Sequence, residues 1–283
     1  MTDARAYRLA RPDDGHTGAF VFSSPHSGRN YPAGFLGRSR LKGTAIRSSE
    51  DAFVDDLFAA APRHGATLIA ATAPRAFIDL NRSADELDPA LILDVGRIPH
   101  NPRIASGLGV IPRVVAGGQP IYDGKIARAE AEARLIDHWH PYHTALRGLM
   151  ADALHHHGRA VLIDCHSMPH EALSNRSPRP DVVLGDRFGA ACGRAIMAEV
   201  EAAFHDAGLR VSRNTPFAGA YITQAYGRPA RDQHAVQVEI DRALYMDEAR
   251  IEKRPDFDAF AALIDRVIAR IVTIGDALPL AAE

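Results

Sequence analysis

Cysteine is scarce in this chain of 283 residues, which contains only Cys165 and Cys192. Neither lies in a CxxC pair, and two residues cannot supply the disulfide framework that stabilises small secreted domains. We therefore expect the protein to work in a reducing compartment, the cytoplasm.

An excess of one charge and long apolar runs are missing too. The chain has 33 basic and 35 acidic residues, a formal net charge of -2 and no block of like charge, so we do not expect it to bind nucleic acid. No window is apolar and long enough to cross a bilayer, and the N-terminal segment has no signal-peptide core. We expect no membrane association.

Internal repeats and low-complexity linkers are also absent, which predicts one domain spanning residues 1–283. Hydrophobic residues make up 46% of the chain and charged residues 24%, as is typical of globular proteins. Predicted strands alternate with predicted helices along the chain. This order is typical of the α/β class.

Short apolar runs predict strands at 18–24, 66–74, 75–82, 159–167, 181–186, 221–226 and 234–240. Helical periodicity predicts helices at 48–61, 123–157, 187–208 and 251–275, with Pro141 dividing the second of them into two. The segment 83–118 is rich in Pro, Gly and Arg and has no sustained periodicity. We expect it to be a long irregular excursion that contacts substrate.

Potential metal ligands occur where predicted strands end or a helix begins. They are His26 in SSPHSG, Asp51 or Glu50 in SSED, and His166 in IDCHS. A catalytic zinc takes three such ligands and keeps one position open for water. The spacing alone is a weak indication, because histidines also bond backbone at strand ends and acids also begin helices. Asp164 either bonds backbone or orients His166 as a ligand.

Other ionisable side chains indicate catalysis and substrate binding. Glu239 lies in the apolar segment HAVQVEI, where a buried acid needs a partner or a function such as general base, although the alternating pattern also fits a solvent-facing strand. Arg75, Asn81 and Arg82 lie at the two ends of RAFIDLNR. Guanidinium groups there could bind a substrate carboxylate, or Arg82 could form a surface ion pair.

Two further patterns have simple structural explanations. The histidines at 155–157 precede Gly158, which is typical of the exposed end of a helix rather than a metal site. Cys165 neighbours His166, but adjacent residues of a strand face opposite sides. We therefore expect the Cys165 thiol to lie in the core.

The chain resembles the N-formylglutamate amidohydrolase family along nearly its whole length. The similarity is carried by the ordered motifs PHSG, SSEDAFVDDLF, RAFIDLNR, GVIPRVV, IYDGK, HPYH, IDCHSMP, GAYIT, YGRP and HAVQVEIDRALYM. This family is similar in fold to zinc carboxypeptidases and aspartoacylases. The resemblance implies an α/β domain with a mixed central sheet flanked by helices.

The resemblance also implies a set of site residues. Those enzymes have an early His and an acid, then Asn-Arg, then His-Ser, then a late Glu, and this chain has the same order: His26, Asp51, Asn81-Arg82, His166-Ser167 and Glu239. One position departs from the pattern. The carboxypeptidases have their acid three residues after the first His, where this chain has Arg29, so the acid is taken from SSED. Asp51 is preferred and Glu50 is the alternative.

The function implied is hydrolysis of N-formyl-L-glutamate to formate and L-glutamate, a step of histidine breakdown, with one Zn²⁺ per chain. In this hypothesis Glu239 is the general base, Arg113 stabilises the oxyanion, and Arg75 and Tyr122 join Asn81 and Arg82 in binding a small acidic N-acyl amino acid. A hydrolase of another N-acyl amino acid or peptide, or a non-catalytic binding module, remains an alternative. The oligomeric state is left open.

Overall fold

The central feature of the fold is a mixed seven-stranded sheet with the strand order β1-β3-β2-β4-β7-β5-β6. The computed structural model describes residues 6–13, 15, 17–96 and 101–274. The strands of this sheet are β1 (Tyr7–Ala10), β2 (Phe20–Ser24), β3 (Thr67–Ala71), β4 (Ala160–Met168), β5 (Val182–Gly185), β6 (Val211–Arg213) and β7 (Gln233–Asp241). A separate ribbon pairs β8 (Met246–Asp247) with β9 (Glu252–Lys253).

Strands β3, β2, β4 and β7 run parallel, whereas β1 is antiparallel to β3 and β5 is antiparallel to β7. The carboxyl ends of β2, β4 and β7 therefore meet at one edge of the sheet. The α/β class with a mixed central sheet, predicted from the sequence, is confirmed.

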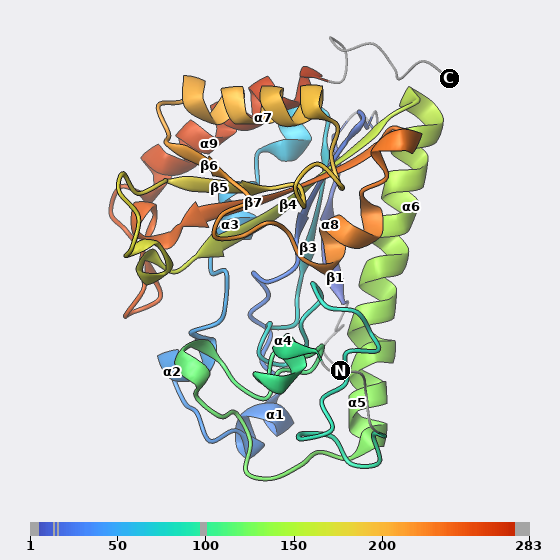
Figure 1. The fold of residues 1–283 in the computed structure, drawn as a ribbon, viewed down its shortest axis with the longest axis vertical. Coiled ribbons are helices and arrows are strands. Elements are labelled where there is room, and N and C mark those ends of the chain that lie inside the picture. Colours follow the sequence, from blue (N-terminus) through green and yellow to red (C-terminus); the bar gives the residue numbers. More distant parts are fainter. Residues whose placement is uncertain (1–5, 14, 16, 97–100, 275–283) are drawn as a thin grey trace.

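Helices cover both faces of the sheet (Figure 1). The longer helices are α6 (His140–His157), α7 (Arg194–Asp206) and α9 (Phe257–Val272). The shorter ones are α1 (Ala33–Arg38), α2 (Thr44–Arg47), α3 (Val54–Leu57), α4 (Pro102–Ala105), α5 (Arg128–Arg134) and α8 (Tyr221–Tyr226). Helices α3, α7 and α9 pack on one face, and α6 and α8 pack on the other. Among the described residues, no helix is both long and apolar enough to span a bilayer.

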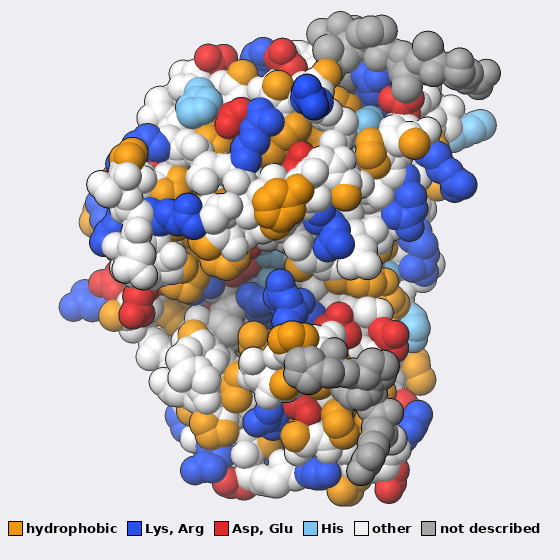
Figure 2. All heavy atoms as spheres, viewed as in Figure 1, with side chains coloured by type: hydrophobic (Ala, Val, Ile, Leu, Met, Phe, Trp, Pro, Cys, Tyr) orange, Lys and Arg blue, Asp and Glu red, His pale blue; other side chains and the backbone are white. Residues whose placement is uncertain are grey.

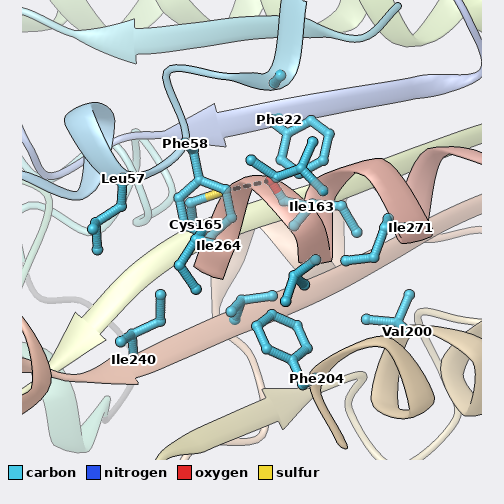
Figure 3. Packing of buried hydrophobic residues seen from close by; sticks show 14 of the residues in the cluster. Phe22, Leu57, Phe58, Ile163, Cys165, Val200, Phe204, Ile240, Ile264 and Ile271 are labelled. Carbon is cyan, nitrogen blue, oxygen red and sulfur yellow. Dashed lines mark hydrogen bonds between the residues drawn. The ribbon is translucent and has the colours of Figure 1, made fainter. Parts of the chain in front are cut away.

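The core on the α7 and α9 side follows the pleat of the strands. Ile163 and Cys165 of β4 and Ile240 of β7 are fully buried there, together with aromatic residues such as Phe22 and Phe204 (Figure 3). The prediction that Cys165 belongs to the core is confirmed. Successive strand residues face opposite sides, so the residues between these apolar ones face the other side of the sheet.

A second part of the molecule lies below the sheet in Figure 1 and consists of α1, α2, α4 and irregular loops. The segment 83–118 belongs to it and is irregular apart from α4 and a 3-10 turn at Ala116–Gly118, although its residues 97–100 lie outside the described part. Helices α5 and α6 run along the side of both parts (Figure 1).

Two predicted strands are wrong. Residues 75–82 form turns, in which the Asp79 N–H donates to Val110 O at 2.8 Å. Ile78 and Leu80 are fully buried, and this apolar alternation imitates a strand without a neighbouring strand to pair with. Residues 221–226 form helix α8, because a short apolar run does not distinguish a buried strand from a helix.

The helix predicted at 48–61 is shorter than expected, since α3 begins only at Val54. Phe53 adopts a left-handed conformation with φ 65°, and the Asp51 N–H donates to His26 O at 3.1 Å. These contacts hold the chain before α3 in a bend that is incompatible with an α-helix.

Pro141 does not divide the predicted helix at 123–157. A π-helical turn, Leu135–Trp139, joins α5 to α6 without interruption. A π turn spaces its hydrogen bonds one residue wider than an α-helix. It directly precedes Pro141, which has no N–H to donate to the preceding turn. Helix α6 ends at His157 with Gly158 at φ 67°, so the histidines at 155–157 are the end of a helix, as predicted.

Candidate functional site

A cavity of about 630 Å³ opens at the carboxyl ends of β2, β4 and β7. In open α/β sheets this edge is the usual place for a ligand. Figure 2 shows the hollow between the two parts of the molecule, with basic side chains inside it. The arginines that line it are Arg75, Arg82, Arg103 and Arg242.

The loop after β2 brings His26 to this cavity. Its close packing requires glycine at position 28, because a Cβ there would lie 2.1 Å from Ala73 O. The hydrogen bond from the Asp51 N–H to His26 O ties the SSED segment to the same loop. Two segments far apart in the sequence therefore present their side chains side by side.

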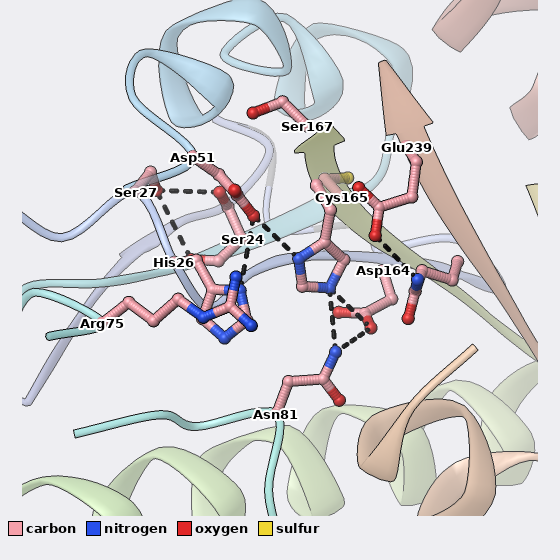
Figure 4. A network of polar contacts seen from close by, with 12 residues as sticks. Ser24, His26, Ser27, Asp51, Arg75, Asn81, Asp164, Cys165, Ser167 and Glu239 are labelled. Carbon is pink, nitrogen blue, oxygen red and sulfur yellow. Dashed lines mark hydrogen bonds and ion pairs between the residues drawn. The ribbon is translucent and has the colours of Figure 1, made fainter. Parts of the chain in front are cut away.

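His26, Asp51 and His166 converge in the cavity and are almost fully buried (Figure 4). The Nδ1 atoms of His26 and His166 lie 3.3 and 2.9 Å from Asp51 Oδ2, and one potential ligand atom from each residue lies within 4.8 Å of the others. Ligand atoms of a tetrahedral zinc are about 3.4 Å apart. The donor set and its spacing thus fit a divalent metal ion after small side-chain shifts.

The second nitrogen of each histidine faces a buried carboxylate. Nε2 of His26 lies 2.7 Å from Asp79 Oδ1, and Nε2 of His166 lies 2.9 Å from Asp164 Oδ2. A carboxylate accepts each Nε2 proton, so a metal ion that displaced the Nδ1 protons would meet Nδ1 lone pairs directed toward Asp51. For Asp164, of the two roles considered from the sequence, the structure favours orientation of His166.

Charges around Asp51 keep this carboxylate ionised. Burial alone would raise its pKa, but the hydrogen bonds from His166 and His26 outweigh burial and hold the pKa well below its usual value. The Arg242 guanidinium also donates to Asp51 Oδ1 at 3.0 Å. An ionised oxygen between two imidazoles is a suitable ligand for a cation.

Glu50 is directed away from this cluster. It accepts hydrogen bonds from Arg47 at 2.9 Å and from Tyr31 at 2.5 Å, and it does not line the cavity. Of the two acids in SSED, the geometry therefore favours Asp51 as the ligand.

Glu239 stands beside His166 on the neighbouring strand, where β4 and β7 pair these two residues. It lines the cavity and is 8% exposed, and Gln237 donates to its Oε1 at 2.8 Å. Burial is the largest cause that raises the pKa of Glu239 to about 7. A carboxylate with a pKa near neutrality can both accept and donate a proton at neutral pH.

Arg75 and Arg82 flank Asp79 beside the cluster of His26, Asp51 and His166. Arg75 Nε donates to Asp79 Oδ2 at 3.0 Å, and Arg82 Nε lies 3.9 Å from the same oxygen. The Arg82 side chain is 6% exposed, yet its Nε makes no hydrogen bond to any described residue. A guanidinium that lines a cavity and whose nearest carboxylate lies 3.9 Å away is suited to an anionic ligand.

A sequence model of the N-formylglutamate amidohydrolase family matches residues 18–246. The chain belongs to this family. N-formylglutamate deformylase of Pseudomonas aeruginosa is 31% identical over 263 residues, which cover 90% of this chain and 93% of that relative. N-formylglutamate deformylase of Pseudomonas putida is 31% identical over 189 residues, which cover 65% and 66% of the two chains. The resemblance inferred from the motifs is confirmed.

Solved structures agree with this membership of the N-formylglutamate amidohydrolase family. The crystal structure of N-formylglutamate amidohydrolase from Ralstonia eutropha superimposes with a TM-score of 0.88 at 36% identity, over 96% of this chain and 99% of that one. A protein of Agrobacterium tumefaciens with 17% identity superimposes with a TM-score of 0.66, covers 95% and 94% of the chains, and shows a shared fold.

Two residues proposed from the sequence as parts of this family's site lie elsewhere. Arg113 donates to Asp88 at 2.9 Å, and Tyr122 accepts from Arg134 at 2.7 Å. Neither lines the cavity. Arg113 belongs to the irregular segment, whose path the sequence does not reveal, and the Tyr122 ring packs in an aromatic cluster that includes Phe35.

Sequence reasoning also missed several residues of the cavity. Asp79 and Gln237 lie in RAFIDLNR and HAVQVEI, but nothing in either motif marks them as residues of a site. Arg242 follows β7 directly and bonds both Asp51 and Ser167, at 3.0 and 3.1 Å. The one signal in the sequence was its place in QVEIDR, since a basic residue next to a buried acidic strand end is a candidate partner.

Proposed function

We propose that this protein is a metal-dependent hydrolase that cleaves N-formyl-L-glutamate to formate and L-glutamate. The observation that carries the proposal is the convergence of His26, Asp51 and His166 beside a buried Glu239 in one cavity. The relatives named N-formylglutamate deformylase support the choice of substrate.

His26, Asp51 and His166 would hold the metal, for which zinc is the natural candidate. When bound, zinc supplies a Lewis acid that polarises the amide carbonyl and lowers the pKa of water. Glu239 takes the proton of the attacking water and passes it to the leaving amine nitrogen. Gln237 holds one oxygen of Glu239, so the other stays free for the proton.

Arg82 binds the α-carboxylate of the substrate, because its guanidinium lines the cavity and its Nε has no hydrogen-bond partner among the described residues. Asn81 lines the same wall, but its side chain is already engaged with Asp164 at 3.3 Å and with the Ile222 N–H at 2.7 Å, so we assign it to shaping the site. Arg75 lines the cavity and Arg113 does not. We therefore assign the developing oxyanion to Arg75 in place of Arg113.

Replacing Arg82 tests the carboxylate site. Arg82→Ala should raise KM for N-formyl-L-glutamate roughly 10- to 100-fold while kcat changes much less, because a charge-assisted hydrogen bond to the substrate is lost. Steady-state kinetics measure both constants. The matched control is Arg113→Ala, which removes a guanidinium that does not line the cavity. An equal rise of KM in both variants would contradict the assignment.

Formate release from N-formyl-L-glutamate is the direct test of the function. Protein stripped with a chelator should be inactive, and stoichiometric zinc should restore turnover, with N-acetyl-L-glutamate and N-formyl-L-aspartate as comparison substrates. We expect N-formyl-L-glutamate to be the preferred substrate. Protein that holds one zinc per chain and releases no formate from either formyl substrate would refute the proposed function and leave the metal site in place.

A further inference from the structure

The π turn between α5 and α6 places two aromatic side chains of the long helix against the substrate-binding segment. Trp139 ends the π turn, and His143 follows one turn later in α6. An α-helix advances about 100° per residue, so a helix without the extra residue of the π turn would rotate Trp139 relative to α5 by about that angle. π turns inside helices are frequent at functional sites.

Both side chains hold carbonyl groups of the segment that carries Arg82. Trp139 Nε1 donates to Arg82 O at 2.9 Å, and His143 Nε2 lies 2.8 Å from Leu80 O. A carbonyl oxygen only accepts, so His143 carries its proton on Nε2, and its Nδ1 accepts from the Tyr226 hydroxyl at 2.9 Å. Trp139 is 6% exposed and His143 is fully buried.

This segment has no strand or helix to fix its backbone. Residues 79–82 form turns, and the nearest local contact is the Asn81 N–H donating to Asp79 Oδ1 at 2.8 Å. The Arg82 side chain adds only a long ion pair, 3.9 Å from Nε to Asp79 Oδ2, and its Nε makes no hydrogen bond to any described residue. The Asn81 side chain ties the segment to Asp164 and to the Ile222 N–H. The two contacts from α6 hold the carbonyls on either side of Asn81, including that of Arg82 itself.

We propose that Trp139 and His143 are positioning residues that fix Arg82 for binding of the substrate carboxylate. The inference rests on the proposed role of Arg82. Neither residue contacts His26, Asp51 or His166 in any described interaction. We therefore expect their loss to affect substrate binding and to leave the proton transfer by Glu239 intact.

Substitutions on α6 separate positioning from general stability. Trp139→Phe and His143→Leu should each raise KM for N-formyl-L-glutamate about 10-fold, with kcat within about two-fold of the parent chain. His143→Gln retains an N–H donor and should recover most of the loss. The matched control is His234→Leu, because His234 is also buried and accepts from the Gly193 N–H at 3.0 Å, away from the cavity.

The choice of substrate sharpens this comparison. 4-Formamidobutyrate has the formyl amide and the distal carboxylate of N-formyl-L-glutamate but lacks the α-carboxylate. Trp139→Phe should leave kcat/KM for this compound unchanged relative to the parent chain. Equal losses on both substrates, or a KM effect in His234→Leu as large as in His143→Leu, would overturn the positioning role.

Trp139 is the only tryptophan of the chain, so its fluorescence gives a readout that needs no turnover. Titration of the zinc-loaded protein with L-glutamate should shift or quench the emission, and Arg82→Ala should abolish this response. An Arg82-dependent response in a protein that releases no formate would refute the proposed function and support the positioning role. Normal turnover with an unchanged KM in Trp139→Phe would support the proposed function and refute the positioning role.

Discussion

Glu239→Gln should lower kcat for N-formyl-L-glutamate by roughly 10² to 10⁴-fold with little change in KM, because an amide cannot accept the proton of the attacking water. Gln has nearly the size of Glu and can still bond Gln237, so the cavity keeps its shape. The loss is therefore chemical rather than structural. Steady-state kinetics together with the zinc content of the variant measure it.

The matched control is Asp241→Asn. Asp241 lies two residues further along the same strand, is also buried and does not line the cavity. It should retain most of the activity. In the parent chain kcat/KM should fall as the pH drops through the pKa of Glu239, which burial raises to about 7, and this acidic limb should be absent from Glu239→Gln. A variant that keeps full turnover would remove Glu239 from the mechanism.

Asp51→Asn should weaken zinc binding by at least about 100-fold, because a ligand that carries a full charge is replaced by a neutral amide. Competition with a chromophoric chelator measures the dissociation constant directly. Activity at limiting zinc should fall in parallel and recover in part when zinc is in excess.

Glu50→Gln is the comparison that separates the two acids of SSED. It removes the same charge one residue earlier, from a side chain that bonds Arg47 and Tyr31 rather than the histidines. Zinc affinity should stay close to that of the parent chain. If Glu50→Gln lost the metal and Asp51→Asn retained it, the ligand assignment would be reversed.

The parts of the fold that the sequence predicts well are those in which burial alone decides the structure. Strands β4 and β7 are buried along nearly their whole length in the centre of the sheet. Their apolar runs therefore predict both the strands and their burial. The same argument identifies His166 and Glu239 as candidate site residues, because burial of an ionisable side chain in an apolar strand is costly unless the side chain has a partner or a function.

Prediction failed where side chains from distant segments replace the usual backbone pairing. Residues 75–82 alternate like a strand, yet their carbonyls bond Trp139 and His143 and their amides bond Asp79 and Val110. No local pattern encodes such partners. The bend before α3 has the same origin, because it depends on the loop that carries His26.

The residues proposed as metal ligands could be predicted as candidates but not as a cluster. Their spacing in the sequence does not fix their distance, and the choice between Asp51 and Glu50 depended on a resemblance to other enzymes. The sequence does not single out Asp79, because the partners of its two oxygens, His26 and Arg75, come together only in the folded chain. Arg113 was chosen for its charge, and the structure shows that charge satisfied by Asp88.

Asp79 contacts both the residues proposed to bind the metal and the arginines proposed to bind the substrate. One of its oxygens faces His26, a proposed metal ligand, and the other accepts from Arg75 and lies near Arg82. Substitutions at these positions are therefore not independent experiments, since the removal of one partner changes the charge and the geometry seen by the others. Free energies from single variants will not add across this group. The energy of metal binding and that of substrate binding can be apportioned here only by a thermodynamic cycle that varies both.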